Sequence, residues 1–186
     1  MAKWMFEPGH TAAGFRVRHM MVTWVRGHFK DVHGSMEFDP ASPGGGRLEV
    51  SIDANKLWTG EPDRDAHLKS ADFLDAANHP NISFKSSIVE QMGAEHHKVS
   101  GDLTIRGITR AAVLDVHYLG EWETPYWEDG RDKGPVTRAG FIATTAINRH
   151  DFNVSWNAPM ARGGIVVGNE VFIEIDVEAL KDWPRA

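Results

Sequence analysis

The chain has 186 residues, a formal net charge of −6 at pH 7 and no cysteine. A chain of this length can bury the core of one domain, which we assign to residues 1–186. The lack of cysteine excludes disulfides, a thiol nucleophile and a cysteine-ligated metal. Lysines and arginines are scattered along the chain, so the composition argues against nucleic acid as a partner.

No apolar run is long enough to span a bilayer, and residues 1–7 lack the apolar centre of a signal peptide. We therefore expect a cytoplasmic protein without a membrane span. A homodimer is compatible with the sequence, which does not decide between one barrel and a pair.

Apolar and polar residues alternate through most of the chain with the period of two that marks a strand with one buried face. In residues 11–19, Phe15 and Val17 share the inner face and two arginines lie on the outer face. His19 lies at the end of the inner face. Residues 20–25 lack the alternation, and we expect a short helical or irregular cap there.

The same alternation predicts further strands joined by hairpin-length links. Gly107 separates two alternating runs, which indicates a β-hairpin. Residues 39–46 form a dense turn signal. The predicted strands span residues 11–19, 27–38, 47–54, 81–90, 97–106, 111–120, 139–147 and 169–179.

Two segments interrupt this pattern. Residues 55–78 are typical of one or two short helices, with Leu68, Phe73 and Leu74 as apolar positions. Residues 120–137 are polar and rich in turn residues, so we predict a loop that is either a lid, a partner contact or a self-packed surface loop. If the protein is an interaction module, this loop is its candidate surface, through Trp122, Tyr126 and Trp127.

About eight antiparallel strands with one apolar face each can close into a barrel, which removes the exposed edges. We therefore predict an all-β fold, an eight-stranded antiparallel barrel closed by one or two short helices. A two-sheet sandwich predicts the same alternation, and periodicity alone does not separate the two. The interior of such a barrel holds either side chains or one small ligand.

Several motifs occur in a specific order over residues 6–179. They are His10-Thr11 with Phe15-Arg16-Val17-Arg18-His19, then Gly27-His28-Phe29, residues 64–74, His79-Pro80-Asn81-Ile82-Ser83-Phe84, residues 101–109, and Ile147-Asn148-Arg149-His150-Asp151-Phe152. In this order and spacing the chain resembles the YceI-like family, the lipocalin-like polyisoprenoid-binding proteins of bacteria. Asn153 stands where the family usually has glycine, and the segment 120–137 looks longer than usual.

The resemblance implies a lipocalin-like barrel with a long isoprenoid or fatty chain in its interior. Such a chain gains about 0.8 kcal/mol for each CH₂ group removed from water. In an arbitrary β-domain the same side chains would fill one another's space as a packed core, but the resemblance favours a pocket. The expected ligand-binding residues are Phe15, Val17, His19, Trp24, Phe29, Met36, Leu103, Ile105, Ile142 and Arg149, with Val171 beside them.

Two arginines lie in charged motifs beside apolar strands. Arg64 or Arg149 could face the phosphate or carboxylate of a ligand, which a planar guanidinium suits. Alternatively, they pair with aspartates and fix the ends of the barrel together with helix caps. The second interpretation is favoured, with Asp65, Asp72 and Asp151 as candidate partners.

Ten histidines raise the alternative of a His-dependent metal enzyme acting on an isoprenoid-type ligand. His19, His67 and His150 could converge in space, but no His-Glu-x-x-His spacing occurs and the adjacent His96-His97 fall in an expected turn. No nucleophile elbow or phosphate-binding glycine loop is present. We therefore expect no metal, no cofactor and no catalysis, and an isoprenoid or fatty-chain ligand as the partner.

Overall fold

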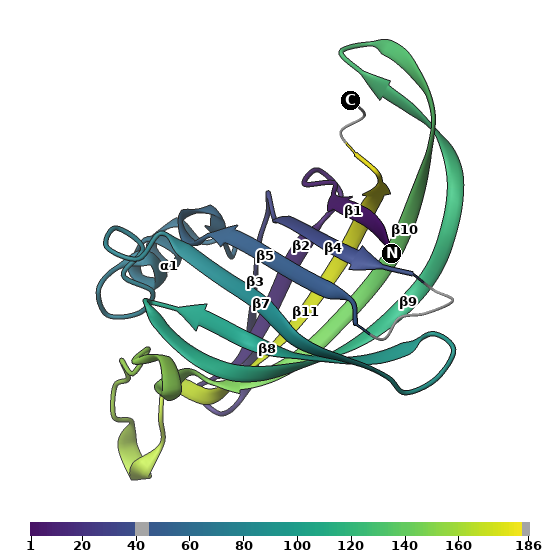
Figure 1. Cartoon of the computed structure of the whole chain (residues 1–186). Helices are drawn as coiled ribbons and strands as arrows, with labels where there is room; N and C mark the ends of the chain where they lie inside the picture. Colours follow the sequence, from purple (N-terminus) through teal and green to yellow (C-terminus); the bar gives the residue numbers. More distant parts are fainter. Residues whose placement is uncertain (40–44, 184–186) are drawn as a thin grey trace.

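The computed structural model describes residues 1–39 and 45–183 (Figure 1), so most of the predicted turn at residues 39–46 lies outside the described residues. The helical elements are α1 (Pro62–Lys69) and three 3₁₀ turns, η1 (Ala54–Lys56), η2 (Arg149–Phe152) and η3 (Ala161–Gly163). The strands are β1 (Ala2–Phe6), β2 (Ala12–His19), β3 (Thr23–Phe29), β4 (His33–Phe38), β5 (Arg47–Asp53), β6 (Leu57–Trp58), β7 (Asn81–Gln91), β8 (His96–Ile105), β9 (Ile108–Glu128), β10 (Arg131–Asn148) and β11 (Val167–Lys181).

Eight strands close into an antiparallel barrel in the order β1-β4-β5-β7-β8-β9-β10-β11, because β1 also pairs with β11. The predicted barrel with a short helix is thus confirmed, and the sandwich alternative is wrong. β11 is shared: its residues 179–181 pair with β1 and its residues 171–176 pair with β2. Through β2 the sheet continues to β3 and β6.

The strands of the barrel are not all those that the sequence predicted. β1 was not expected, although Trp4 and Phe6 of this strand are buried and alternate with more exposed neighbours. The single run predicted at 27–38 is two strands, β3 and β4, separated by a turn in which Asp31 has a φ of 61°. The cap predicted at 20–25 is wrong from Thr23 onward, where β3 begins.

The predicted loop at 120–137 is a pair of strands. β9 and β10 continue far beyond the barrel as one hairpin that turns at Asp129-Gly130 (Figure 1). Tyr126 packs on Trp183 with ring centroids 4.4 Å apart, so the hairpin contacts the segment that follows β11. Trp122 and Trp127 are 76% and 62% exposed.

The two-residue turn Arg106-Gly107 joins β8 to β9, as the alternation predicted. Both residues have positive φ values, 51° and 72°, which is the type I′ geometry that matches the twist of two antiparallel strands. No helix in the described ranges is long and apolar enough to cross a membrane.

Replacing Gly107 should test this turn. We expect Gly107→Ala to lower the free energy of unfolding by about 1–3 kcal/mol, because a Cβ would strain the backbone and approach Nδ1 of His79 at 2.9 Å. Gly130→Ala is the matched control, since its φ is also 72° but a Cβ there meets nothing within 4 Å. Urea unfolding measures both, and equal losses would contradict the steric part of the argument.

Candidate ligand-binding cavity

A cavity of about 180 Å³ lies inside the barrel, beneath α1, the residues that follow it, and η2. Its wall is almost wholly apolar. The lining residues are Ala13, Gly14, Phe15, Val17, Phe29, Val50, Ile52, Leu57, Leu68, Phe73, Leu74, Ile82, Ser83, Phe84, Leu103, Ile105, Leu114, Thr145, Ile147, Arg149, Phe152, Val154, Val167, Val171, Ile173 and Ile175. Among these described residues Arg149 alone carries a charge.

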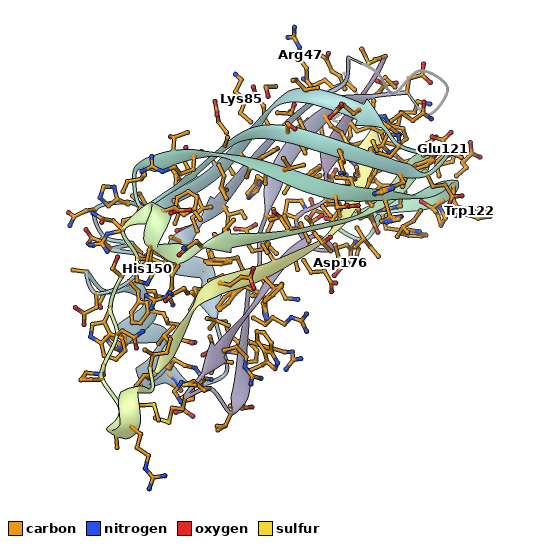
Figure 2. All side chains as sticks on the ribbon, turned by 90° about the horizontal axis from the view of Figure 1, so that it is seen from below. Arg47, Lys85, Glu121, Trp122, His150 and Asp176 are labelled. Carbon is orange, nitrogen blue, oxygen red and sulfur yellow. The ribbon has the colours of Figure 1, made fainter. Side chains whose placement is uncertain are left out.

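The cavity occupies only one end of the barrel. Strands β2, β3 and β6 contribute to its wall, whereas no described residue of β1 or β4 does. The wall of the cavity thus includes β2, β3 and β6, whereas β1 and β4 complete the ring of strands at the other end. Figure 2 shows the two ends, with His150 of η2 at one and Glu121 and Trp122 of the long hairpin at the other.

The other end is filled by four rings, which we call the aromatic plug: Phe38, His97, Tyr118 and Phe141. Phe38 contacts the other three rings with centroids 5.3–5.7 Å apart. The indole nitrogen of Trp4 donates to the carbonyl of Phe38 at 3.1 Å. The interior is therefore packed at one end and hollow at the other.

His97 contributes an imidazole ring to the plug. Its side chain is 3% exposed, and its Nε2 has no hydrogen-bond partner among the described residues. Burial, assisted by the nearby charge of His96, holds the pKa of His97 below the ordinary value of 6.5. Burial thus favours the neutral form of the ring.

Arg149 is buried, with 4% exposure, at the edge of the cavity. Its guanidinium donates four hydrogen bonds, from Nε to the carbonyl of Gly168, from Nη1 to Val154 and Trp156, and from Nη2 to Val167. These bonds use four of its five N–H groups, and burial lowers its pKa. Its expected pairing with an aspartate is wrong, because backbone carbonyls occupy the guanidinium.

Arg64 holds the segment that precedes α1. It donates from Nε to the hydroxyl of Thr59 at 2.8 Å and from Nη2 to the carbonyl of Thr59 at 3.1 Å. Asp65 accepts hydrogen bonds from the same threonine, so the two residues fix the start of α1. Arg64 does not line the cavity.

The proposed convergence of His19, His67 and His150 is not seen in the described part of the chain. His67 hydrogen-bonds Asp72 at 2.9 Å, and its ring lies edge-on to Phe73 and Trp156. It therefore supports the cover of the cavity.

Six of the ten expected ligand-binding residues line the cavity, as does Val171. The six are Phe15, Val17, Phe29, Leu103, Ile105 and Arg149. Met36 is buried but belongs to β4, opposite Trp4 in the ladder, and so lies outside the cavity. Contact of the lining residues with a ligand stays a prediction.

Besides Met36, three further expected residues lie outside the cavity. Trp24 lies opposite Arg18 in the ladder, on the outer face, where it packs edge-on against Phe172 with the guanidinium of Arg16 5.0 Å from its ring. Ile142 lies on the outer face, since its neighbours Phe141 and Ala143 take the buried positions of β10. His19 lies at the end of β2 and does not reach the cavity wall.

Sequence reasoning also missed part of the wall. Leu68, Phe73 and Leu74 come from the helical segment and cover the cavity. Their apolar character in an otherwise polar segment was the available signal.

Comparison with known proteins agrees with this geometry. The family model described as YceI-like domain matches residues 4–179. UPF0312 proteins of Pseudomonas putida (strain W619) and Enterobacter sp. (strain 638) are 31% and 34% identical over 175 residues, which are 94% of this chain and 83% of each relative. The chain belongs to the YceI-like family. The resemblance seen in the motifs is thus confirmed.

Solved structures share the fold. The YceI protein of Campylobacter jejuni is 29% identical, with a TM-score of 0.71 over 88% of both chains. BcnA of Burkholderia cenocepacia is 22% identical, with a TM-score of 0.75 over 93% of this chain and 98% of BcnA. A polyisoprenoid-binding domain of Saccharophagus degradans is 11% identical, with a TM-score of 0.63 over 96% and 98%.

Asn153 stands where the resemblance led us to expect glycine. Asn153 has a φ of 61° and ends η2 in the left-handed conformation. Asparagine adopts this conformation more readily than most residues.

Removal of the Arg149 guanidinium should destabilise the fold. We expect Arg149→Gln to lower the free energy of unfolding by about 3 kcal/mol or more, because several buried carbonyls lose their donor. Arg110→Gln is the control, since exposed Arg110 donates one bond to the carbonyl of Thr109 and its loss should cost under about 0.5 kcal/mol. If chemical denaturation gives similar losses of unfolding free energy for both variants, the four carbonyl contacts of Arg149 do not stabilise the fold as argued.

The buried ring of His97 predicts a pH effect. Since its folded pKa lies below 6.5, the unfolded chain binds the proton more tightly, and the free energy of unfolding should fall as the pH drops below about 6.5. His97→Leu should reduce this loss, because it removes the buried ring whose pKa differs between the folded and unfolded chain. Urea titrations at pH 7.5 and 5.5 measure the loss of unfolding free energy in the unaltered protein and in His97→Leu. The same loss in both proteins would contradict the assignment of the pH effect to His97.

Proposed function

We propose that this protein binds a long apolar amphiphile, such as an isoprenoid or fatty chain, and sequesters or carries it without chemical change. The observation that carries the proposal is the apolar cavity inside the barrel. An engineered cavity of about 150 Å³ lined by Leu, Ile and Phe binds benzene. The present cavity, at about 180 Å³, suits a segment of a hydrocarbon chain.

Burial of the chain supplies the binding energy. Eight CH₂ groups removed from water would contribute about 6 kcal/mol before the cost of association. A ligand of this kind needs no catalytic group to be held, only a dry wall of matching shape. The described lining residues include no histidine, which favours binding over the alternative of a His-dependent metal enzyme.

Arg149 supports a polar end on the ligand. It is a cation at the edge of an otherwise apolar cavity, and one of its N–H groups is not used by the four carbonyl contacts. We propose that a phosphate, carboxylate or hydroxyl of the amphiphile lies near this side chain, with the hydrocarbon chain directed into the barrel.

The structural neighbours are consistent with such a ligand. A domain of Saccharophagus degradans that is described as polyisoprenoid-binding has the same fold, which supports an isoprenoid as a candidate ligand class. The identity of the ligand, the cytoplasmic location and a homodimer stay predictions for the present chain.

A pair of variants on one strand tests the proposal. Ile147 of β10 lines the cavity, whereas Ile142 of the same strand faces outward. We expect Ile147→Trp to fill the cavity and weaken binding of a fluorescent polyene fatty acid at least tenfold. Ile142→Trp should bind like the unaltered protein.

Native mass spectrometry of the protein purified from its own host should show the amphiphile in the unaltered protein and in Ile142→Trp. Its loss from Ile147→Trp alone would support the cavity as the site. An empty protein that also ignores added isoprenols and fatty acids would defeat the proposal, as would equal binding by both variants.

A further inference from the structure

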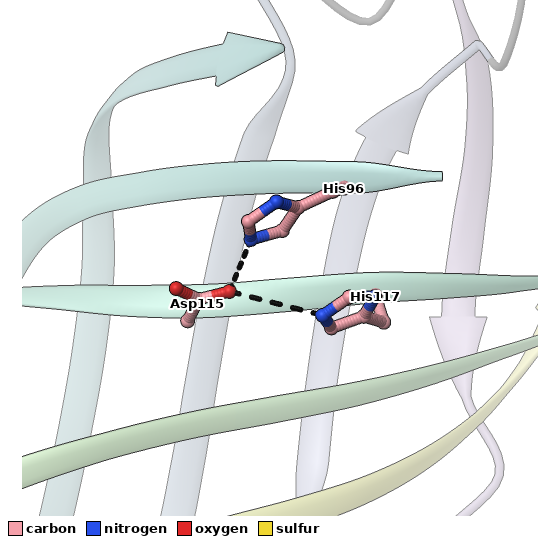
Figure 3. A group of neighbouring side chains, drawn as sticks. All are labelled: His96, Asp115 and His117. Carbon is pink, nitrogen blue, oxygen red and sulfur yellow. Dashed lines mark hydrogen bonds and ion pairs between the residues drawn. The ribbon is translucent and has the colours of Figure 1, made fainter. Parts of the chain in front are cut away.

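A cluster of three metal-ligating side chains lies on the outer face of the barrel, away from the cavity. His96 is the first residue of β8, and it lies directly opposite His117 of β9. Asp115 lies two residues before His117 on β9 and so points to the same face. Figure 3 shows the two rings and the carboxylate turned toward one another.

The three groups meet at their ligand atoms. Nε2 of His96 hydrogen-bonds Oδ1 of Asp115, and Nε2 of His117 lies 4.0 Å from the same oxygen. The two imidazole rings are stacked, with centroids 4.6 Å apart and an angle of 7° between their planes. One ligand atom from each residue lies within 4.8 Å of the other two.

We propose that His96, Asp115 and His117 bind a divalent transition-metal ion, with Zn²⁺ as the best match. Two imidazole nitrogens and one carboxylate oxygen are ligands that zinc prefers, and a water completes a tetrahedral site. Zn–N and Zn–O distances of about 2.0–2.2 Å would place the ligand atoms about 3.3 Å apart. The ligand atoms must therefore approach one another by roughly 1–1.5 Å, and the stacked rings must tilt so that both nitrogen lone pairs point to one ion.

The carboxylate of Asp115 is available to a cation. Asp115 has ion-pair contacts only with the two histidines among the described residues. Lys98 lies opposite Asp115 in the ladder, but it is in turn opposite Glu90 and makes no described ion pair with Asp115. The carboxylate therefore keeps lone pairs that a metal ion can use, and the half-exposed side chains give the ion access from solvent.

A second cluster provides a comparison. Glu7, His10 and Glu178 also place ligand atoms within 4.8 Å of one another. Oε1 of Glu178, however, already accepts from the guanidinium of Arg138, whose positive charge opposes a bound metal. We therefore assign the metal to His96, Asp115 and His117.

The site is separate from the proposed ligand cavity. His97 follows His96 and points to the opposite face of β8, into the aromatic plug. A metal on the outer face would join β8 to β9 at the packed end of the barrel. It would therefore stabilise the barrel without contact with an amphiphile in the cavity.

The test uses the full chain without a histidine tag, after treatment with a chelator and dialysis. Titration calorimetry with ZnCl₂ should show one ion per chain. His117→Gln and Asp115→Asn should each weaken binding at least tenfold, whereas His10→Gln and His33→Gln should leave it unchanged. Circular dichroism confirms that each variant is folded.

Two further measurements identify the ligands. Zn²⁺ at a hundredfold excess over its Kd should raise the Tm by roughly 5–10 °C, and this rise should vanish in His117→Gln. Co²⁺ should give the visible absorption of a tetrahedral site in the unaltered protein and lose it in the same variant. The proposal is overturned if no stoichiometric binding is found, if His117→Gln binds as tightly as the unaltered protein, or if His10→Gln abolishes binding instead.

Discussion

The pairing of β11 with three other strands governs the shape of the interior. β11 pairs with β10 along most of its length, with β1 near its end and with β2 nearer its start. Where β1 and β4 complete the ring, the barrel is narrow enough for Phe38, His97, Tyr118 and Phe141 to fill it. Where β2, β3 and β6 stand instead, the side chains leave a cavity.

Two arginines hold the irregular cover over the hollow end. Arg106, in the β8–β9 turn, donates to the carbonyls of Ala71, Phe73 and Asn153. Arg149 binds four carbonyls between Val154 and Gly168. Because these segments have few strand or helix hydrogen bonds of their own, guanidinium donors satisfy carbonyls that would otherwise be buried without a partner.

The sequence predicted the barrel and the correct inner face wherever apolar and polar residues alternate strictly, as for Leu103 and Ile105. It failed at Ile142, because apolar residues occupy both faces of that part of β10 and periodicity does not choose between them. Trp24 was misplaced for a similar reason, since an apolar run hid the start of β3.

The periodicity of the sequence does not predict which residues contact one another across the fold. Arg149 could not be assigned its carbonyls from the chain alone, because these belong to segments with no regular pattern. The pairing of His96 with His117 depends on the register of β8 and β9, and His96 was expected in a turn when it begins a strand.

The short strand β6 ends the sheet at the hollow end of the barrel. It pairs with β3 through His28 and Phe29, and in the described part of the chain its other edge has no strand partner. Ile52 and Asp53 of β5 pair with β7, while the described pairing with β4 ends at Ser51. If the proposed amphiphile occupies the cavity, passage of its tail between β5 and β6 would break fewer strand-to-strand hydrogen bonds than passage through a continuous ladder.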